Sequence, residues 1–409
     1  MKSSDIRDIV VVYDKLTLNN GDIILKLKLK PIYIAIRDFF KNADMFLLTV
    51  CLILSAIGMV LIYSSTRSYE TNSYIYVQLA SILIGIVLFV ILSIIDIDII
   101  TQKWPILLAF NVLIIAALFI WGEEGGTGNR SWFRFGGIGI QPTELVKITF
   151  TLLFAKQMSF LHNSNRGISS PISMVQLAAH LLFMFALIII TSSDLGSALI
   201  FIAIFLVMCF AGGVRMIWFL LGIGAVAALS PFAWNNFLSD YQKARIMAPY
   251  FPETVDPTGL GITWQVNHSK VALASGGFWG QGFMQGTQSQ SDALFAKHTD
   301  FIFSVAGEEF GAIGCFLIIA LLLTVIIRCI YIGLKSNNYM NTVICCGMAA
   351  MLGFQTFENI GMCLGLTPVI GLTIPFVSYG GSSIISCFAA IGIVSGIRIR
   401  PNPTRRYRY

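Results

Sequence analysis

The sequence predicts an all-α polytopic membrane protein with about ten transmembrane helices. The 409 residues are 56% hydrophobic and only 12% charged, the mean hydropathy is +0.78, and the apolar residues gather in long runs. Soluble domains are about 45–50% apolar and about 25% charged. A helix needs about 20 predominantly apolar residues to cross a bilayer. The composition therefore excludes a soluble globular fold.

Apolar runs of about this length follow one another along the chain, several of them interrupted by glycine or polar residues. They begin near Met45, Tyr76, Trp104, Ile140, Ser173, Ser197, Met216, Phe301, Asn341 and Ser382. Residues 44–400 form the predicted transmembrane domain, with extracellular loops at about 122–140 and 230–299. The second loop is large and joins helices 7 and 8. Because cytoplasmic segments retain Lys and Arg, the basic tails predict that both termini are cytoplasmic.

Residues 1–43 are predicted to form a cytoplasmic N-terminal tail. Two nearly alternating runs, VVVYDKLTL and DIILKLKLK, surround an Asn-Asn-Gly-Asp turn signal, which indicates a β-hairpin. The following PIYIAIRDFFK has the pattern of an interfacial amphipathic helix. Residues 401–409 form a basic cytoplasmic tail. The eight cysteines lie in or at the ends of apolar runs without metal-binding spacing, so we interpret them as free thiols.

Residues 275–309 form the densest polar cluster of the chain. Within it, His298, Thr299 and Asp300 directly precede the apolar run that begins at Phe301. A carboxylate at the boundary between membrane and water is costly unless it has a task. Asp300 is therefore a candidate general base, and His298 and Thr299 are candidates to bind a ligand or to hydrogen-bond Asp300. The alternative is that Asp300 is the N-cap of the following helix.

Glu144 and Lys147 are the next candidates. They are three residues apart in a segment that starts with Pro142, so they share one face of a helix and can form an ion pair. An intramembrane ion pair points into the bundle or toward a watery cavity. The pair therefore either lines a substrate cavity or fixes the helix register.

A set of basic residues lies in the two extracellular loops. Its members are Arg130, Arg134, Lys243, Arg245 and Lys270, with Lys297 on the same side. Arginine forms two parallel hydrogen bonds with phosphate oxygens. If the set faces one cleft, it predicts a site for a pyrophosphate. For any single residue, anchoring to anionic headgroups of membrane lipids is the alternative.

Two glycine-rich segments need separate interpretations. GGFWGQGFMQG lacks a surrounding βαβ unit, so we reject nucleotide binding there and assign the glycines to tight turns or close packing. We expect no nucleic-acid partner.

Residues 368–383 combine proline and glycine at membrane depth, where non-helical backbone is tolerated only inside protein or beside a cavity. We expect them to form a re-entrant segment that packs on the site.

Several segments together resemble the SEDS family (shape, elongation, division, sporulation) of RodA-, FtsW- and SpoVE-like proteins. They are GNRSWFRFGGIGIQPTELVK, SSDLGSALIF, YQKARI, SGGFWGQGFMQGTQSQ, HTDFIFSVAGEE and FENIGMCLGLTPVIGLTIPFVSYGGSS, in the family's order over about residues 45–400. GTQSQ and FENIGM are more similar to the RodA branch than to the FtsW branch. One departure is Phe295-Ala296-Lys297, which replaces the usual Leu-Pro-Glu and so affects loop geometry or efficiency.

The resemblance implies ten transmembrane helices and a peptidoglycan glycosyltransferase that polymerises lipid II on the outer face of the cytoplasmic membrane. The expected role is cell-wall elongation and cell shape, with division and sporulation as alternatives. It implies that Asp300 is the essential acidic residue and that Glu144 and Lys147 match the family's charged pair. It also implies a class B penicillin-binding protein, a transpeptidase, as partner.

The implied chemistry suits the candidate residues. Asp300 would take the proton of the acceptor's 4-hydroxyl, and the cations of the outer loops, together with Lys147, would stabilise the departing pyrophosphate. A divalent cation, Mg or Mn, could share this work, but the sequence gives no ligand set and predicts no other cofactor. A lipid II flippase and a non-catalytic scaffold for a partner synthase are the alternative functions.

Overall fold

The computed structural model describes residues 39, 43–69, 71–123, 129–135, 138–236 and 238–399. The chain divides into two compact units, residues 1–45 and residues 46–409. The predicted N-terminal hairpin, the interfacial helix apart from Phe39, and the basic C-terminal tail lie outside the described residues.

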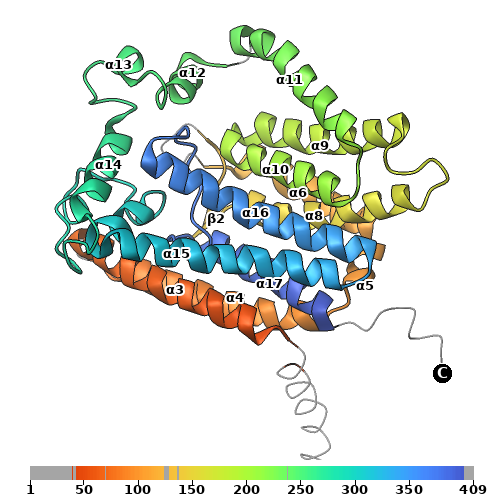
Figure 1. Ribbon diagram of the computed structural model, residues 1–409, viewed down its shortest axis with the longest axis horizontal. Coiled ribbons are helices and arrows are strands. Elements are labelled where there is room, and N and C mark those ends of the chain that lie inside the picture. The colour runs from red at the N-terminus through yellow and green to blue at the C-terminus, as the bar shows by residue number, and fades with distance from the viewer. Residues whose placement is uncertain are drawn as a thin grey trace, which may run out of the picture. The chain divides into compact units, whose positions relative to one another are not determined.

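The second unit is built mainly from helices that run side by side (Figure 1). A short β-hairpin of β1 (Phe133–Phe135) and β2 (Ile138–Ile140) lies in the first loop, with Arg134 opposite Gly139. The helices up to this hairpin are α3 (Met45–Thr66), η1 (Arg67–Tyr69), α4 (Ser73–Ile94), α5 (Ile97–Gln102), α6 (Trp104–Ala116) and α7 (Leu118–Trp121). Those after it are α8 (Pro142–His162), α9 (Pro171–Ser192), α10 (Leu195–Ala211), α11 (Met216–Asn236), α12 (Asp240–Met247), α13 (Pro252–Val255), α14 (Trp264–Gly276), α15 (Ile302–Lys335), α16 (Tyr339–Leu364) and α17 (Gly381–Ile399).

The prediction of an all-α polytopic membrane protein is confirmed. In the part of the chain that the structure describes, eight helices are long and apolar enough to cross a membrane. They lie at Met45–Tyr69, Ser73–Ile94, Trp104–Trp121, Pro171–Ser192, Met216–Asn236, Ile302–Lys335, Tyr339–Leu364 and Gly381–Arg398. The two other predicted runs also form helices, α8 and α10, but neither is among the eight. The α8 helix is too polar to be counted, because it contains Glu144, Lys147 and Lys156, and α10 is too short, because it has only 17 residues.

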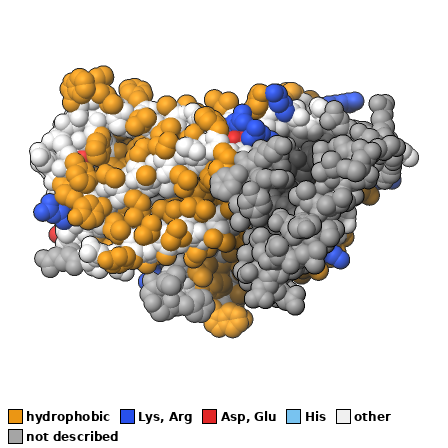
Figure 2. All heavy atoms as spheres, turned by 90° about the horizontal axis from the view of Figure 1, so that it is seen from below, with side chains coloured by type: hydrophobic (Ala, Val, Ile, Leu, Met, Phe, Trp, Pro, Cys, Tyr) orange, Lys and Arg blue, Asp and Glu red, His pale blue; other side chains and the backbone are white. Residues whose placement is uncertain are grey.

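Hydrophobic side chains cover the outside of the helices as well as the interior, as Figure 2 shows for one face. Large exposed apolar residues recur along the outward-facing sides of the helices; on α4 they include Leu79, Leu83 and Val87. Such a surface suits contact with lipid chains and not with water. All eight cysteines are free and all but Cys315 are buried, as expected from the sequence.

The segment predicted as the second extracellular loop starts later than expected. The prediction placed its start at about residue 230, whereas α11 continues through Pro231 to Asn236. Proline removes one backbone donor but neighbouring groups can compensate for this within a membrane helix. The rest of the loop is ordered by α12, α13 and α14, which confirms that it is more than a flexible connection.

The glycines of the GGFWGQG segment support a break in α15. At Gly311 the backbone has φ 67° and ψ −164°, so residues 302–310 and 312–335 are two helical pieces. The backbone amides of Gln281 and Gly282 donate to the carbonyls of Glu308 and Glu309, at 2.8 and 3.1 Å. The loop thereby satisfies carbonyls that the break leaves without helical partners. The prediction of tight turns and close packing for these glycines is confirmed.

Replacing Gly276 by alanine is expected to destabilise the protein by about 1–3 kcal/mol, the usual cost of overpacking. A Cβ on Gly276, at the end of α14, would overlap the backbone carbonyl oxygen of Gly307 on α15. The melting temperature of the purified variant measures the effect. Gly222→Ala on α11 is the matched control, because open space surrounds a Cβ there. Equal melting temperatures for the two variants would contradict the predicted close approach of α14 and α15.

Candidate functional site

Asp300 lies in the turn directly before α15, and two other segments hold it in place. The Asn359 side-chain amide on α16 donates to the backbone carbonyl of Asp300, at 2.7 Å, and to that of Leu372, at 2.5 Å. A Cβ at Gly371 would lie 3.5 Å from the Asp300 carboxylate oxygen Oδ2. The N-cap of α15 is Phe301, without a side-chain cap, so the structure does not support the interpretation of Asp300 as the N-cap.

The surroundings of Asp300 favour a base near neutral pH. Burial raises the pKa of this carboxyl to about 6, while a hydrogen bond from Thr299 and the positive charge of Arg245 oppose the increase. Burial disfavours the charged form because the protein solvates a carboxylate less well than water does. A pKa close to the working pH allows a group to be both ionised and a competent proton acceptor.

His298, a predicted ligand-binding residue, lies in an aromatic cluster directly before Asp300. Its ring lies among the rings of Tyr69, Tyr74 and Tyr379, with centroid distances of 5.6, 4.9 and 5.6 Å. Burial, together with the charge of Lys297, lowers the pKa of His298 to about 4, so the imidazole is neutral. His298 therefore packs in an aromatic cluster that fixes the turn before Asp300.

Lys297, which departs from the family pattern, fastens the same turn to the end of α3. It is 1% exposed, and its ammonium group donates to Ser68 Oγ at 3.1 Å and to the Ser291 carbonyl at 2.9 Å. The ammonium nitrogen also lies 5.3 Å from the centroid of the Tyr69 ring, a cation–π arrangement. The neighbouring Phe295 is 67% exposed. Residues 295–297, which stand where the family resemblance leads us to expect Leu-Pro-Glu, are thus held in place by the contacts of Lys297.

The structure brings two of the predicted cations together. Arg245 of α12 and Lys270 of α14 line a small cavity of about 20 Å³, with Thr263, Asn267 and Val369 in its wall. The end of the Lys270 side chain lies directly against Gly365, where a Cβ would overlap it. The cavity is therefore positively charged and also has hydroxyl and amide groups, and its volume admits about one water-sized group, such as a single phosphate oxygen.

The other predicted cations are arranged differently. Lys243 pairs with Asp240 on its own helix, with 3.6 Å between Nζ and Oδ1. Arg134, on β1, pairs with Glu123 at 4.0 Å, and both side chains are more than half exposed. The backbone amide of Arg130 donates to the Ser192 carbonyl at 3.1 Å, which places Arg130 at the end of α9. Among the predicted cations that the structure describes, Arg245 and Lys270 are the pair that lines one cavity.

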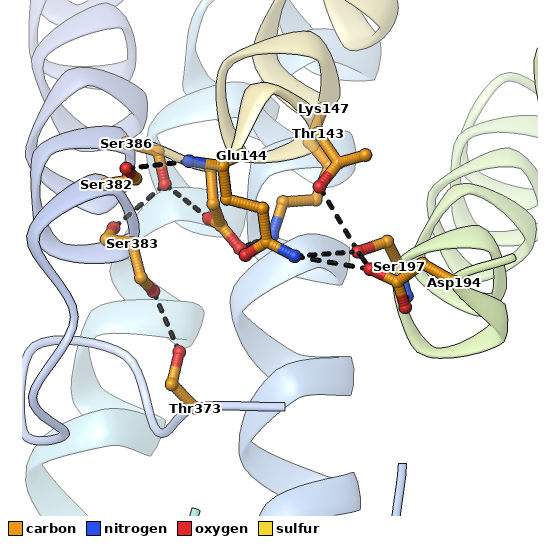
Figure 3. A network of polar contacts seen from close by, with 10 residues as sticks. Thr143, Glu144, Lys147, Asp194, Ser197, Thr373, Ser382, Ser383 and Ser386 are labelled. Atoms are coloured by element: carbon orange, nitrogen blue, oxygen red, sulfur yellow. Dashed lines mark hydrogen bonds and ion pairs between the residues drawn. The ribbon is translucent and has the colours of Figure 1, made fainter. Parts of the chain in front are cut away.

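Glu144 and Lys147 form a buried ion pair on α8 (Figure 3). The Lys147 Nζ lies 2.7 Å from Glu144 Oε1, and Ser386 of α17 donates to Glu144 Oε2 at 2.8 Å. The exposed fractions are 0% for Lys147 and 4% for Glu144. Because both charges are satisfied inside the bundle, the structure favours a pair that fixes α8 against α17 over a wall of a cavity.

A second polar group in Figure 3 joins α8 to α10. Asp194 caps α10 through the Ser197 amide, at 3.0 Å, and its other oxygen accepts from the Ser197 hydroxyl and from Gln141. The Thr143 and Ser197 hydroxyls are 3.2 Å apart. The start of α8 around Pro142 is therefore hydrogen-bonded to α10 as well as to α17.

Glu308 and Glu309 hold the polar loop in place. Both are buried, and both accept hydrogen bonds from the loop. Glu308 accepts from the backbone amides of Gln288 and Ser289, each at 2.7 Å, and Glu309 accepts from Ser64 of α3 at 2.5 Å. The two carboxylates thus fix residues 287–290 between α3 and the first piece of α15.

Residues 365–380 form the non-helical segment expected from the sequence. They connect α16 to α17 and contain two glycines with positive φ, Gly365 at 71° and Gly371 at 74°. The Tyr379 amide donates to the His298 carbonyl at 2.9 Å. This contact and that of Gly371 place the segment against the Asp300 turn, as predicted.

The sequence interpretation missed Asn359, which positions Asp300, and named Glu358 only as one of several intramembrane carboxylates. The sequence signal that could have identified both residues is the adjacent polar pair Glu358 and Asn359 inside an apolar run. No group of three or more His, Cys, Asp or Glu side chains suited to a metal ion occurs in the described ranges. The structure therefore identifies no ligand set for the divalent cation.

The fold and site define a multi-pass membrane protein with a carboxylate positioned beside a cation-lined cavity. A family model described as "Cell cycle protein", for FtsW, RodA and SpoVE, matches residues 44–402. The chain belongs to this family, the SEDS family.

Two curated relatives illustrate the similarity. The chain is 33% identical to "Peptidoglycan glycosyltransferase MrdB" of Escherichia coli K12 over 323 residues, which cover 78% of this chain and 84% of the relative. It is 30% identical to "Probable peptidoglycan glycosyltransferase FtsW" of Bacillus subtilis over 383 residues, which cover 88% and 92%.

Two solved structures share the fold over 90% of this chain and 99% of their own. The crystal structure of the rod shape determining protein RodA of Thermus thermophilus superposes with a TM-score of 0.65 at 25% identity. A chain from a structure described as "Structural coordination of polymerization and crosslinking by a peptidoglycan synthase complex" superposes with a TM-score of 0.73 at 27% identity.

Proposed function

We propose that this protein is a peptidoglycan glycosyltransferase that polymerises lipid II into β-1,4 glycan strands on the outer face of the cytoplasmic membrane. Its family and the activity in the names of its relatives support this. The observation that carries the proposal is the position of Asp300, whose carboxyl has a pKa of about 6 and is influenced by the charge of Arg245.

The proposed reaction is a direct displacement with inversion. The 4-hydroxyl of the acceptor sugar attacks the anomeric carbon of a donor that is α-linked to undecaprenyl pyrophosphate. Asp300 takes the hydroxyl proton, the new β-1,4 bond forms, and the bond to the pyrophosphate oxygen breaks. Arg245 and Lys270, which line one cavity, are placed to stabilise the charge that develops on the departing pyrophosphate.

The rate is expected to depend on the ionisation of Asp300. A general base must be ionised, so kcat/KM should be nearly constant above about pH 7 and fall about tenfold per pH unit well below pH 6. Initial rates with purified protein and lipid II between about pH 4.5 and 8 measure the profile. A rate that stays constant down to about pH 5 would remove Asp300 as the base.

A single reconstitution separates this function from the two alternatives. Purified protein is placed in liposomes with labelled lipid II, and both glycan products and movement of lipid II between leaflets are followed. The proposal expects glycan strands without movement. Movement without strands would indicate the flippase. A protein that is inactive alone but stimulates a partner synthase would indicate the scaffold.

We further propose a role in cell-wall elongation together with a class B penicillin-binding protein. Similarity to a chain of a synthase complex described by polymerization and crosslinking supports the partnership. The MrdB and FtsW relatives are both 33% identical to this chain, so overall identity favours neither branch. The elongation role therefore rests on the RodA-like GTQSQ and FENIGM segments. Depletion should produce rounded cells for elongation and undivided filaments for division, and copurification tests the partner.

A further inference from the structure

Two neighbouring side chains on α16 are buried without hydrogen-bond partners. Gln355 is 1% exposed and Glu358 is 4% exposed. Neither the amide oxygen and nitrogen of Gln355 nor the two carboxyl oxygens of Glu358 have a partner among the described residues. Residues three apart lie on the same face of a helix. Buried polar groups in folded proteins are nearly always hydrogen-bonded, so four unsatisfied atoms on one face require an explanation.

The Glu358 end of this face of α16 lies close to the proposed catalytic carboxyl, and Gln355 lies one turn of the helix further from it. Glu358 interacts electrostatically with both Asp300 and Arg245. The next residue, Asn359, donates to the Asp300 backbone carbonyl at 2.7 Å. The hydroxyl of Thr367 donates to the Glu358 backbone carbonyl at 3.1 Å. It also lies near the Glu358 carboxyl, but neither carboxyl oxygen has a hydrogen bond of good geometry.

The 365–380 segment contacts both the cation-lined cavity and the Asp300 turn. Val369 lines the cavity beside Arg245, and Gly371 lies against Asp300. Gly365 and Gly371 both have positive φ, a conformation that glycine adopts without strain. Because Gln355 and Glu358 are buried, a sugar reaches them only when this segment is displaced, and rotation at the two glycines is the movement that the inference requires.

We propose that Gln355 and Glu358 form the subsite for the acceptor sugar. The Glu358 carboxyl accepts a hydrogen bond from a sugar hydroxyl and holds the attacking hydroxyl against Asp300. The Gln355 side chain has an NH₂ group that donates and a carbonyl oxygen that accepts, which match the carbonyl and N–H of the amide of an N-acetylated sugar. The inference rests on the proposed glycosyltransferase function and makes Glu358 a positioning residue, with Asp300 as the group that takes the proton.

Glu358→Met is the decisive substitution, because methionine has a similar length but cannot form the hydrogen bond. The kcat/KM for glycan polymerisation should fall about 10–100-fold, as expected for one lost hydrogen bond to substrate. The melting temperature should stay equal or increase, because an unsatisfied buried polar group disappears. Glu358→Gln, whose amide oxygen still accepts, should retain activity within about threefold to tenfold.

The matched control is Thr356→Val, two residues earlier on α16. Thr356 is also buried, and its hydroxyl donates only to the Leu352 carbonyl of its own helix, at 2.8 Å. Its kcat/KM should remain unchanged. If Glu358→Met does not fold, Gln355→Met tests the same face and should reduce kcat/KM about tenfold.

Two results would overturn the subsite. Full activity of Glu358→Met would show that the carboxyl does not touch the substrate. Parallel loss of stability and activity would indicate a purely structural group. Asp300→Asn, assayed beside these variants, separates the failures: if it polymerises normally, the proposed mechanism fails, whereas an inactive Asp300→Asn with a fully active Glu358→Met removes only the subsite.

Discussion

Replacing Asp300 by asparagine is expected to reduce glycan polymerisation by about 10²–10⁴-fold, the usual contribution of a general base. Asparagine has the same shape but cannot accept the hydroxyl proton at neutral pH. The fold should remain intact, because α16 holds Asp300 through its backbone carbonyl and the carboxylate caps no helix. Gel analysis of the glycan products made from lipid II measures the effect.

Asp292→Asn is the matched control for this prediction. Asp292 is an exposed aspartate in the same polar loop, eight residues before Asp300. Its charge acts on Lys297 and Tyr69 but is not among the groups that act on Asp300. Its replacement removes the same charge from the loop and leaves the residues proposed to touch the substrate unchanged, so normal polymerisation is expected. An Asp300→Asn protein with an unchanged melting temperature and a normal rate would refute the assignment of the base.

Replacing Lys147 by methionine is expected to destabilise the protein by about 3–5 kcal/mol, the cost of leaving one charge of a buried pair without its partner. Glu144 is 4% exposed and would keep only its hydrogen bond from Ser386. The melting temperature and the yield of folded protein in detergent measure the loss. Adding Glu144→Gln to this variant should recover much of it, because the remaining carboxylate is removed.

Lys243→Met provides the comparison. Lys243 also pairs with an acidic residue three positions away, but Asp240 is fully exposed. Exposed pairs contribute little to stability, so a change below about 1 kcal/mol is expected. If the Lys147 and Lys243 variants melt at the same temperature, the pair on α8 does not hold the bundle together.

The predictions from local sequence were reliable where the signal itself is local. Each predicted apolar run coincides with a helix, because a lipid-exposed chain must satisfy its own backbone hydrogen bonds over the thickness of the bilayer. Proline and glycine in residues 368–383 identified the non-helical segment for the same reason. Asp300 directly precedes an apolar run, and this position alone predicted that it lies at the end of a membrane helix.

The sequence could not decide which polar residues act together. Arg130, Arg134, Lys243 and Arg245 looked alike as loop cations, and only the folded loop brings Arg245 of α12 and Lys270 of α14 to the wall of one cavity. Glu308 and Glu309 looked like groups on different helix faces. The fold wraps residues 288–290 around both carboxylates: the Gln288 amide donates to Glu308, and the Gln290 side-chain amide donates to Glu309.

By itself, the sequence determined the membrane class, the order of the helices, the family and the candidate base. The tertiary structure alone decided that Glu144 and Lys147 join two helices, and that the side chains of Gln355 and Glu358 are buried without hydrogen-bond partners among the described residues. The physical reason is the separation along the sequence between the residues that each interaction joins. Helix formation and membrane insertion depend on neighbours within a few turns, whereas burial, charge pairing and hydrogen-bond satisfaction depend on residues more than a hundred positions away, such as Ser386 for Glu144.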